Sequence, residues 1–425
     1  MARRWGGLLL TAHVTVALAF LPVNQPASAS ARMRVGPTRL KATAGERPTK
    51  ARLLKARTVL PPVAAPVAPV APVAPVATPA AAPAAMAPAA VKPITLAPTT
   101  VAPITVAPAA LAATRIDPAR FQRLQAALDA WTRTASGVES ITVAMHIDGY
   151  TWEAGSRPDS GPSPDAGARY RTMSITKTVT AALVLRAVDN GKLNLDAPLP
   201  RIDGVPTAVP DGINVRRLLA HRSGLADYTE ATGYRADQPM TPQQAVELSL
   251  HAPPVSAPGT TTRYVNSNYL LLGLLLQQVH QRSFADLVAD LTGPLGLVNT
   301  SVEPPDRPGW AGFSSGGIMS TVGDMARWGD ALFTPGRVVT AGSLKLMATT
   351  GDLEGGLGLW GVCPCTDRAP GGDRFTAIGH FTAAGGMFRF PRAGMTLVMK
   401  AEPAGGDTIT RAVSLSRVLI DELTG

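Results

Sequence analysis

A serine and a lysine three positions apart, Ser174 and Lys177, stand at the start of a strongly apolar segment. If this segment is helical, both side chains face the same side of its first turn, and the amine can reach the hydroxyl. A lysine whose pKa is lowered by desolvation and nearby cations can take the serine proton. The pair therefore predicts a serine nucleophile with a lysine base; the alternative is a serine N-cap beside a solvated lysine.

A second serine, Ser314, lies in the stretch Gly312-Phe-Ser-Ser-Gly316, which satisfies Gly-x-Ser-x-Gly, the pattern of a nucleophile elbow. Such an elbow needs a buried strand before the serine and a helix directly after it. The preceding Trp310-Ala-Gly is a poor strand, and the turn that starts at Gly317 delays the next helix. Ser174 is therefore the favoured nucleophile.

Histidines and cysteines do not suggest a metal site. His146, His221, His251 and His280 show no paired spacing of metal ligands, so we predict no zinc site. Cys363 and Cys365 are separated by one proline. They could close a small strained disulfide in an oxidising compartment, or remain two thiols in a surface loop.

The elements that position these residues follow from hydrophobic periodicity. In chain order we expect a helix over 117–134, a hairpin over 141–155 that turns at Asp148-Gly149, an apolar helix over 174–190 that ends at Gly191, helical patterns to about residue 335, Gly-rich alternating segments, and a final helix over 407–423. Strands at both ends with helices between them predict a mixed α/β domain: an antiparallel sheet flanked by helices, plus an all-helical subdomain.

Composition divides the chain near residue 114. Residues 1–31 carry two arginines, an apolar run and then small residues, which predicts a secretory signal peptide, with an uncleaved anchor as the alternative. Residues 32–60 are basic and expected to be disordered. Residues 61–114 repeat Ala, Pro and Val, which favours an extended spacer. The folded domain is expected over 115–425, in a protein that is secreted or extracellular.

The formal net charge of +10 belongs mainly to this N-terminal region, because nine Lys or Arg and one Glu lie between residues 32 and 57. The folded domain is close to neutral, so we expect no nucleic-acid partner. The basic segment either contacts anionic cell-wall polymers or is a solvated spacer. The protein is expected to be a monomer.

Five segments resemble the serine β-lactamase, DD-peptidase and related esterase family, particularly its class C branch. They are residues 171–199 (RTMSITKTVTAALVLRAVDNGKLNLDAPL), 215–225 (VRRLLAHRSGL), 258–273 (PGTTTRYVNSNYLLLG), 316–332 (GGIMSTVGDMARWGDAL) and 378–386 (IGHFTAAGG). They occur in the order of the family's motifs and span most of 115–425. The resemblance implies a β-lactamase/transpeptidase-like fold and a cofactor-free serine hydrolase that works through an acyl-enzyme at Ser174.

The resemblance also implies roles for other residues. Tyr264-Val-Asn266 is similar to the family's Tyr-x-Asn, in which the phenol shuttles a proton and the amide holds the lysine or the substrate. A phenol beside a cationic lysine has a lowered pKa, which suits a general base or acid. His380 would hydrogen-bond near Tyr264 or steer the substrate's charge. The oxyanion hole would combine the backbone N–H groups of Ser174 and Ala383.

The chain departs from the family at His380-Phe381-Thr382, where His-Thr-Gly or Lys-Thr-Gly is usual. The missing Thr hydroxyl normally helps to bind a substrate carboxylate, and the missing Gly lets substrate lie close to the strand. Phe381 and Thr382 are therefore our substrate-binding candidates. The resemblance implies a D-alanyl-D-alanine carboxypeptidase or β-lactamase-like enzyme that acts on a small molecule or a peptidoglycan peptide. The departure leaves open a carboxylesterase or a non-catalytic penicillin- or muropeptide-binding module.

Overall fold

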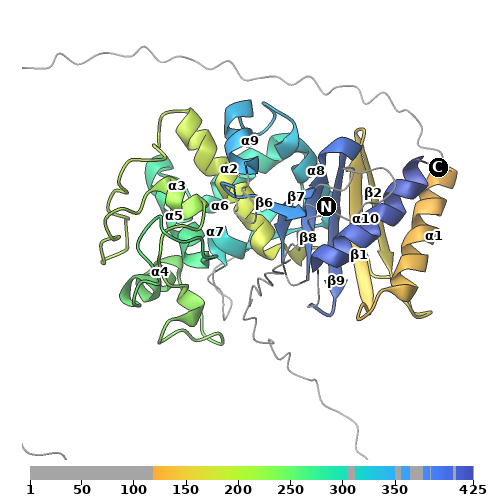
Figure 1. The fold of residues 1–425 in the computed structure, drawn as a ribbon, viewed down its shortest axis with the longest axis horizontal. Coiled ribbons are helices and arrows are strands. Elements are labelled where there is room, and N and C mark those ends of the chain that lie inside the picture. Colours follow the sequence, from red (N-terminus) through yellow and green to blue (C-terminus); the bar gives the residue numbers. More distant parts are fainter. Residues whose placement is uncertain are drawn as a thin grey trace, which may run out of the picture. The chain divides into compact units, whose positions relative to one another are not determined.

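A six-stranded antiparallel sheet, with strand order β2-β1-β9-β8-β7-β6, joins the first two strands of the domain to its last four (Figure 1). The computed structural model describes residues 118–303, 312–349, 356–363, 377–382, 384–404 and 408–424. The predicted signal peptide, basic segment, spacer and Cys365 lie outside these residues. The strands of the sheet are β1 (Ser140–Ile147), β2 (Tyr150–Ser156), β6 (Trp360–Cys363), β7 (Ala377–Phe381), β8 (Gly385–Phe390) and β9 (Met395–Glu402).

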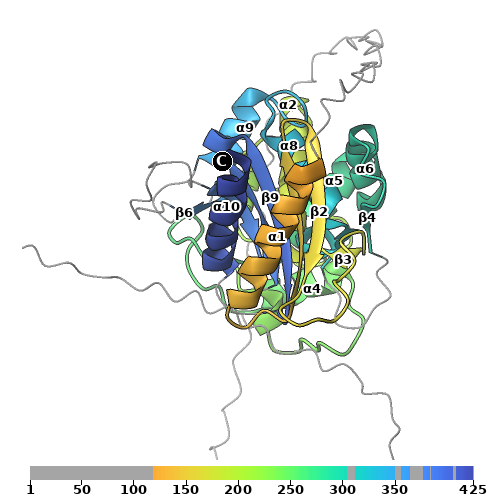
Figure 2. The ribbon, with the colours of Figure 1, turned by 90° about the vertical axis from the view of Figure 1, so that its right-hand side faces the viewer.

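The two faces of this sheet contribute to different hydrophobic cores. On β1, Ile141, Val143 and Met145 point to one core and Ala144 to the other, as the period of two requires. Helices α1 (Pro118–Thr134) and α10 (Thr408–Thr424) pack against the first face (Figure 2). Helix α8 (Val322–Phe333) packs against the second face. The predicted hairpin is confirmed, with positive φ at Asp148 and Gly149 in its turn.

A helical part is inserted between β2 and α8, as the sequence predicts. Its helices are α2 (Thr176–Asp189), α3 (Val215–Leu219), α4 (Pro242–His251), α5 (Asn266–His280), α6 (Phe284–Thr292) and α7 (Phe313–Gly316). Helix α5 is buried on every side from Ser267 to Leu276, because it runs through the middle of this part and packs against α2, α3, α4 and α7. The pair α2 and α5 is the rigid support for the residues that could do chemistry.

Two features of the fold differ from the sequence prediction. A second, three-stranded sheet joins β3 (Tyr170–Arg171), β5 (Ile318–Ser320) and β4 (Ser301–Val302), in the order β3-β5-β4. These strands have two or three residues, too few for a period of two to be visible. Helix α9 (Ala341–Ala348) follows residue 335, where alternating segments were expected. Among the residues that the structure describes, no helix is long and apolar enough to cross a membrane.

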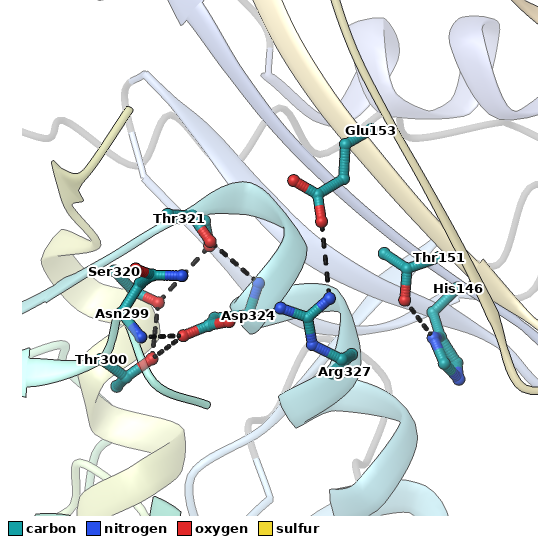
Figure 3. Close-up of polar contacts among 9 residues, drawn as sticks. All are labelled: His146, Thr151, Glu153, Asn299, Thr300, Ser320, Thr321, Asp324 and Arg327. Atoms are coloured by element: carbon teal, nitrogen blue, oxygen red, sulfur yellow. Dashed lines mark hydrogen bonds and ion pairs between the residues drawn. The ribbon is translucent and has the colours of Figure 1, made fainter. Parts of the chain in front are cut away.

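Helix α8 is anchored by a polar network that links it to the second sheet and to the hairpin (Figure 3). The Asp324 carboxylate is fully buried, and it accepts hydrogen bonds from the backbone N–H of Asn299 at 2.8 Å and the Thr300 hydroxyl at 3.0 Å. It also pairs with Arg327, whose guanidinium reaches Glu153 on β2 at 3.4 Å. Asp324 is therefore the shared acceptor for three donors: the Asn299 backbone N–H, the Thr300 hydroxyl and the Arg327 guanidinium.

Replacing Asp324 by alanine is expected to lower the free energy of unfolding by about 3 kcal/mol, because it leaves buried donors and a cation without their acceptor. Urea titration followed by circular dichroism measures this change. Asp290→Ala is the control, since Asp290 pairs with Arg282 on the surface and should cost under about 1 kcal/mol. Equal stability of the two variants would contradict an anchoring role for Asp324.

Candidate active site

Ser174 lies in a short 3-10 turn, Met173–Ile175, that leads directly into α2. The turn is fixed at its start, since Thr172 donates from its backbone N–H to the Ile318 carbonyl at 2.8 Å and from its hydroxyl to the same oxygen at 3.1 Å. The sequence predicted one helix from Ser174 onwards, and the structure begins the α-helix two residues later. Ser174 is only half-buried, so a substrate can reach its hydroxyl.

Lys177 lies in the first turn of α2 and is fully buried. Its Nζ has three oxygen neighbours: Ser174 Oγ at 3.2 Å, Asn266 Oδ1 at 2.8 Å and the Ser315 carbonyl at 2.7 Å. The structure therefore brings Ser174, Lys177 and Asn266 together, as the resemblance implied. The contact with the Ser315 carbonyl was not predicted from the sequence.

These contacts fix how a neutral Lys177 is oriented. An amide oxygen and a backbone carbonyl can only accept hydrogen bonds. A neutral amine has two N–H groups, so both must point to Asn266 and Ser315, and the lone pair then faces the Ser174 hydroxyl. Burial lowers the pKa of Lys177 to about 7, with the charge of Asp227 acting in the opposite direction. A substantial fraction of Lys177 is thus a neutral base at physiological pH.

Tyr264 donates a hydrogen bond from its hydroxyl to Ser174 Oγ at 2.6 Å. Its ring is stacked on His221, with ring centroids 4.5 Å apart, and Trp360 lies 6.2 Å away. The expected lowering of its pKa by Lys177 is wrong. Burial raises the pKa of Tyr264 well above the ordinary value for a phenol, and its hydrogen bond to Ser174 only partly offsets this. Tyr264 is consequently a neutral phenol that can give a proton.

His380 lies on β7 and faces the site, with its ring centroid 6.2 Å from that of Tyr264. His380 was expected to hydrogen-bond near Tyr264, but its Nδ1 contacts the Phe381 carbonyl at 3.2 Å. Its Nε2 is buried with no partner among the described residues. Burial, helped by the charge of Lys177, lowers the pKa of His380 to about 3. A neutral imidazole does not steer an anionic substrate by its charge, so that expectation is corrected.

The structure does not place the side chains of Phe381 and Thr382 as substrate ligands. Phe381 follows His380 on the strand and packs with the core beneath α1 and α10, on the opposite face of the sheet. The Thr382 hydroxyl is used within its own turn, where it accepts from the Ala384 and Gly385 backbone N–H groups at 3.2 Å each. Ala383, the second predicted oxyanion-hole residue, lies outside the described residues.

The competing serine, Ser314, is fully buried in α7 and donates to the Tyr269 carbonyl at 2.7 Å. Its surroundings exclude an elbow, because a Cβ on Gly273 of α5 would come within 2.1 Å of the Ser314 hydroxyl. The Ser314 carbonyl accepts from Thr180 of α2 at 2.7 Å. The α7 turn thus joins α2 to α5 and presents the Ser315 carbonyl to Lys177.

Sequence reasoning missed three neighbours of the site. Asp227 is buried behind Asn266, and a single acid within the apolar stretch Gly224-Leu-Ala-Asp-Tyr228 was the available signal. Trp360 on β6 lies beside the rings of His221 and Tyr264. His221, considered from the sequence only as a metal ligand, accepts a hydrogen bond at Nδ1 from the Val265 backbone N–H at 3.0 Å.

Comparison with known proteins agrees with this geometry. The Beta-lactamase family model matches residues 121–359. Penicillin-binding protein 4 of Amycolatopsis lactamdurans is 26% identical over 340 residues, which are 69% of this chain and 88% of that protein. The D-alanyl-D-alanine-carboxypeptidase/endopeptidase AmpH of Escherichia coli is 28% identical over 198 residues, 41% of this chain and 51% of AmpH.

Solved structures share the fold. D-amino acid amidase from Ochrobactrum anthropi SV3, complexed with L-phenylalanine amide, has a TM-score of 0.58 and 21% sequence identity. The alignment covers 72% of this chain and 99% of the amidase. The match of the family model over more than half of the chain, together with the Ser174, Lys177 and Tyr264 cluster, shows that this protein belongs to the beta-lactamase family of serine hydrolases.

Proposed function

We propose that this protein is an exported amidohydrolase that forms an acyl-enzyme at Ser174 and cleaves an amide bond next to a D-amino acid. One observation carries the proposal: the Ser174 hydroxyl lies between a buried lysine that can accept its proton and a neutral phenol that can donate one. Export is supported by the signal-peptide pattern of residues 1–31. The D-configuration is supported by the activities named for AmpH and for D-amino acid amidase.

Acylation begins with proton transfer from Ser174 Oγ to the lone pair of neutral Lys177. The oxygen then attacks the substrate carbonyl. Negative charge develops on the carbonyl oxygen beside the backbone N–H of Ser174, which lies in the 3-10 turn that leads into α2. This N–H, with the positive end of α2, stabilises the tetrahedral intermediate.

Breakdown of the intermediate requires a proton on the leaving nitrogen, which is otherwise a poor leaving group. Tyr264 gives its hydroxyl proton to that nitrogen and regains one from protonated Lys177. The C–N bond breaks, and the amine departs from an ester at Ser174. Water then attacks the ester and passes its proton through the same two groups, which restores the Ser174 hydroxyl and releases the acid.

The strand side of the site favours a leaving group without a carboxylate. His380 is neutral because burial lowers its pKa, and the Thr382 hydroxyl is engaged within its turn. Neither side chain offers the charge or hydrogen bond that would stabilise a substrate carboxylate. An amide or an amidated peptide therefore suits the described part of the site better than a peptide with a free C-terminus.

The proposal is tested by comparing D- and L-phenylalanine amide, and a D-Ala-D-Ala peptide with its C-terminal amide, as substrates of the full chain. We expect kcat/KM to be at least about tenfold higher for the D-amide than for the L-amide, and higher for the amidated peptide than for the free acid. Intact-mass analysis with penicillin and peptide mapping would locate an adduct. Folded protein that neither forms an adduct nor turns over any of these compounds would refute the proposal.

A further inference from the structure

Asp227 lies behind Asn266, on the side away from Lys177. Each of its two carboxylate oxygens accepts two hydrogen bonds. Its Oδ2 accepts from both the backbone N–H of Asn266 and the Asn266 Nδ2, the latter at 3.0 Å. Its Oδ1 accepts from Thr229, at 3.0 Å from the backbone N–H and 2.7 Å from the hydroxyl. A carboxylate only accepts, so it admits one orientation of the neighbouring amide.

That orientation determines what Lys177 encounters. With Nδ2 held by Asp227, Asn266 must turn Oδ1 to Lys177, where the 2.8 Å contact is found. With the amide reversed, an NH₂ group would face Lys177, compete for its lone pair when it is neutral and repel it when it is charged. Asp227 therefore influences Ser174 indirectly: it orients Asn266, Asn266 orients Lys177, and Lys177 contacts the nucleophile.

Among the described residues, Asp227 supplies the negative charge near Lys177. The other titratable groups around the amine are neutral: burial raises the pKa of both phenols and lowers the pKa of both imidazoles. These groups are Tyr264, Tyr269, His221 and His380. Asp227 raises the pKa of Lys177 against the effect of burial, which is larger. Its carboxylate is buried, so water screens this interaction only weakly.

We propose that Asp227 is a positioning residue of this hydrolase, which locks the Asn266 amide so that the lone pair of Lys177 faces Ser174 and whose charge keeps Lys177 an effective base. The inference rests on the proposed function, because it requires Lys177 to take the Ser174 proton. It assigns a part in the reaction to a residue outside the Ser-x-x-Lys and Tyr-x-Asn motifs.

The decisive variant is Asp227→Asn, which keeps the shape of the side chain but loses the charge and adds donors facing Asn266. We expect kcat/KM to fall by about 10- to 100-fold, since the Lys177 amine loses its alignment. We also expect the acidic limb of the pH profile to move to lower pH by about one unit, because removing a nearby carboxylate lowers the pKa of a lysine. The rate of Ser174 acylation by a fluorophosphonate, measured by intact mass between pH 5 and 9, gives the same limb.

Three further variants separate positioning from general damage. Thr229→Val removes one hydrogen bond to Asp227 but keeps its charge, so the limb should stay in place. Asp196→Asn makes the same chemical change at an exposed ion pair with Arg216 and should leave the profile unchanged. Asp227→Ser, smaller and neutral, should reproduce the shift if the asparagine variant does not fold.

A folded Asp227→Asn protein whose acidic limb coincides with that of the wild type would overturn the inference, whatever its activity. Failure of the proposed function has a different signature. In that case the wild type itself would show no adduct at Ser174, or a rate of acylation that does not depend on pH near 7.

Discussion

Replacing Ser174 by alanine is expected to lower kcat/KM for a D-amino acid amide by at least about 10³-fold and to abolish the covalent adduct with penicillin. The Ser174 hydroxyl lies between the lysine amine and the phenol, and both hydrogen bonds end on its oxygen. Without it, the site retains a base and an acid but has no atom to be acylated. Steady-state kinetics and intact-mass analysis measure the two effects.

Ser314→Ala is the matched control for this experiment, because Ser314 occupies the competing motif. Its hydroxyl is fully buried and bonded to the Tyr269 carbonyl, so its removal should cost stability while turnover persists. Activity retained in the Ser174 variant and lost in the Ser314 variant would reverse the assignment of the nucleophile.

Replacing Lys177 by methionine is expected to lower kcat/KM by about 10²- to 10⁴-fold, the range typical of removing a general base. In the wild type, burial lowers the pKa of Lys177 to about 7. The neutral amine is the active form, so kcat/KM should fall about tenfold per pH unit below pH 7 and level off above it. Measurement of kcat/KM from pH 5 to 9 tests both expectations.

Lys192→Met provides the control for loss of a lysine, since Lys192 is exposed and its amine contacts only His280 among the described residues. This variant should keep the wild-type rate and the wild-type pH profile. A Lys177→Met protein of nearly wild-type activity, or a wild-type profile that is flat from pH 5 to 9, would show that another group deprotonates Ser174.

The sequence was sufficient to predict the elements that carry the site and most of its polar side chains. Ser174 and Lys177 are close in the chain, and local spacing in a helix dictates that they meet. Tyr264, Asn266 and His380 were assigned by resemblance, and the structure places all three around Lys177. Successive side chains of a strand point to opposite faces, which is enough to place Phe381 away from His380. The prediction that Phe381 binds substrate rested on the motif and ignored this alternation.

Two properties of the site depend on the tertiary structure. The protonation state of Tyr264 depends on burial, which raises the pKa of the phenol, and on its hydrogen bond to Ser174, which lowers it, and only the folded structure shows that burial is the larger effect. Asp227 is 39 positions before Asn266 and belongs to a loop without periodicity. Its local sequence does not show which buried donor it accepts from, because that donor, the Asn266 amide, belongs to α5.

The proton-transfer residues come from the helical part and His380 comes from the sheet, so the two parts should differ in how well they tolerate substitution. Ser174, Lys177, Tyr264, Asn266 and the Ser315 carbonyl all come from α2, α5, α7 and the residues that lead into them, a tightly packed body in which few substitutions are tolerated. His380 comes from β7, near the end of the sheet. Mutational libraries directed at β7 should therefore yield new substrate preferences while the proton transfers stay intact, whereas libraries in α2 or α5 should yield mainly inactive proteins.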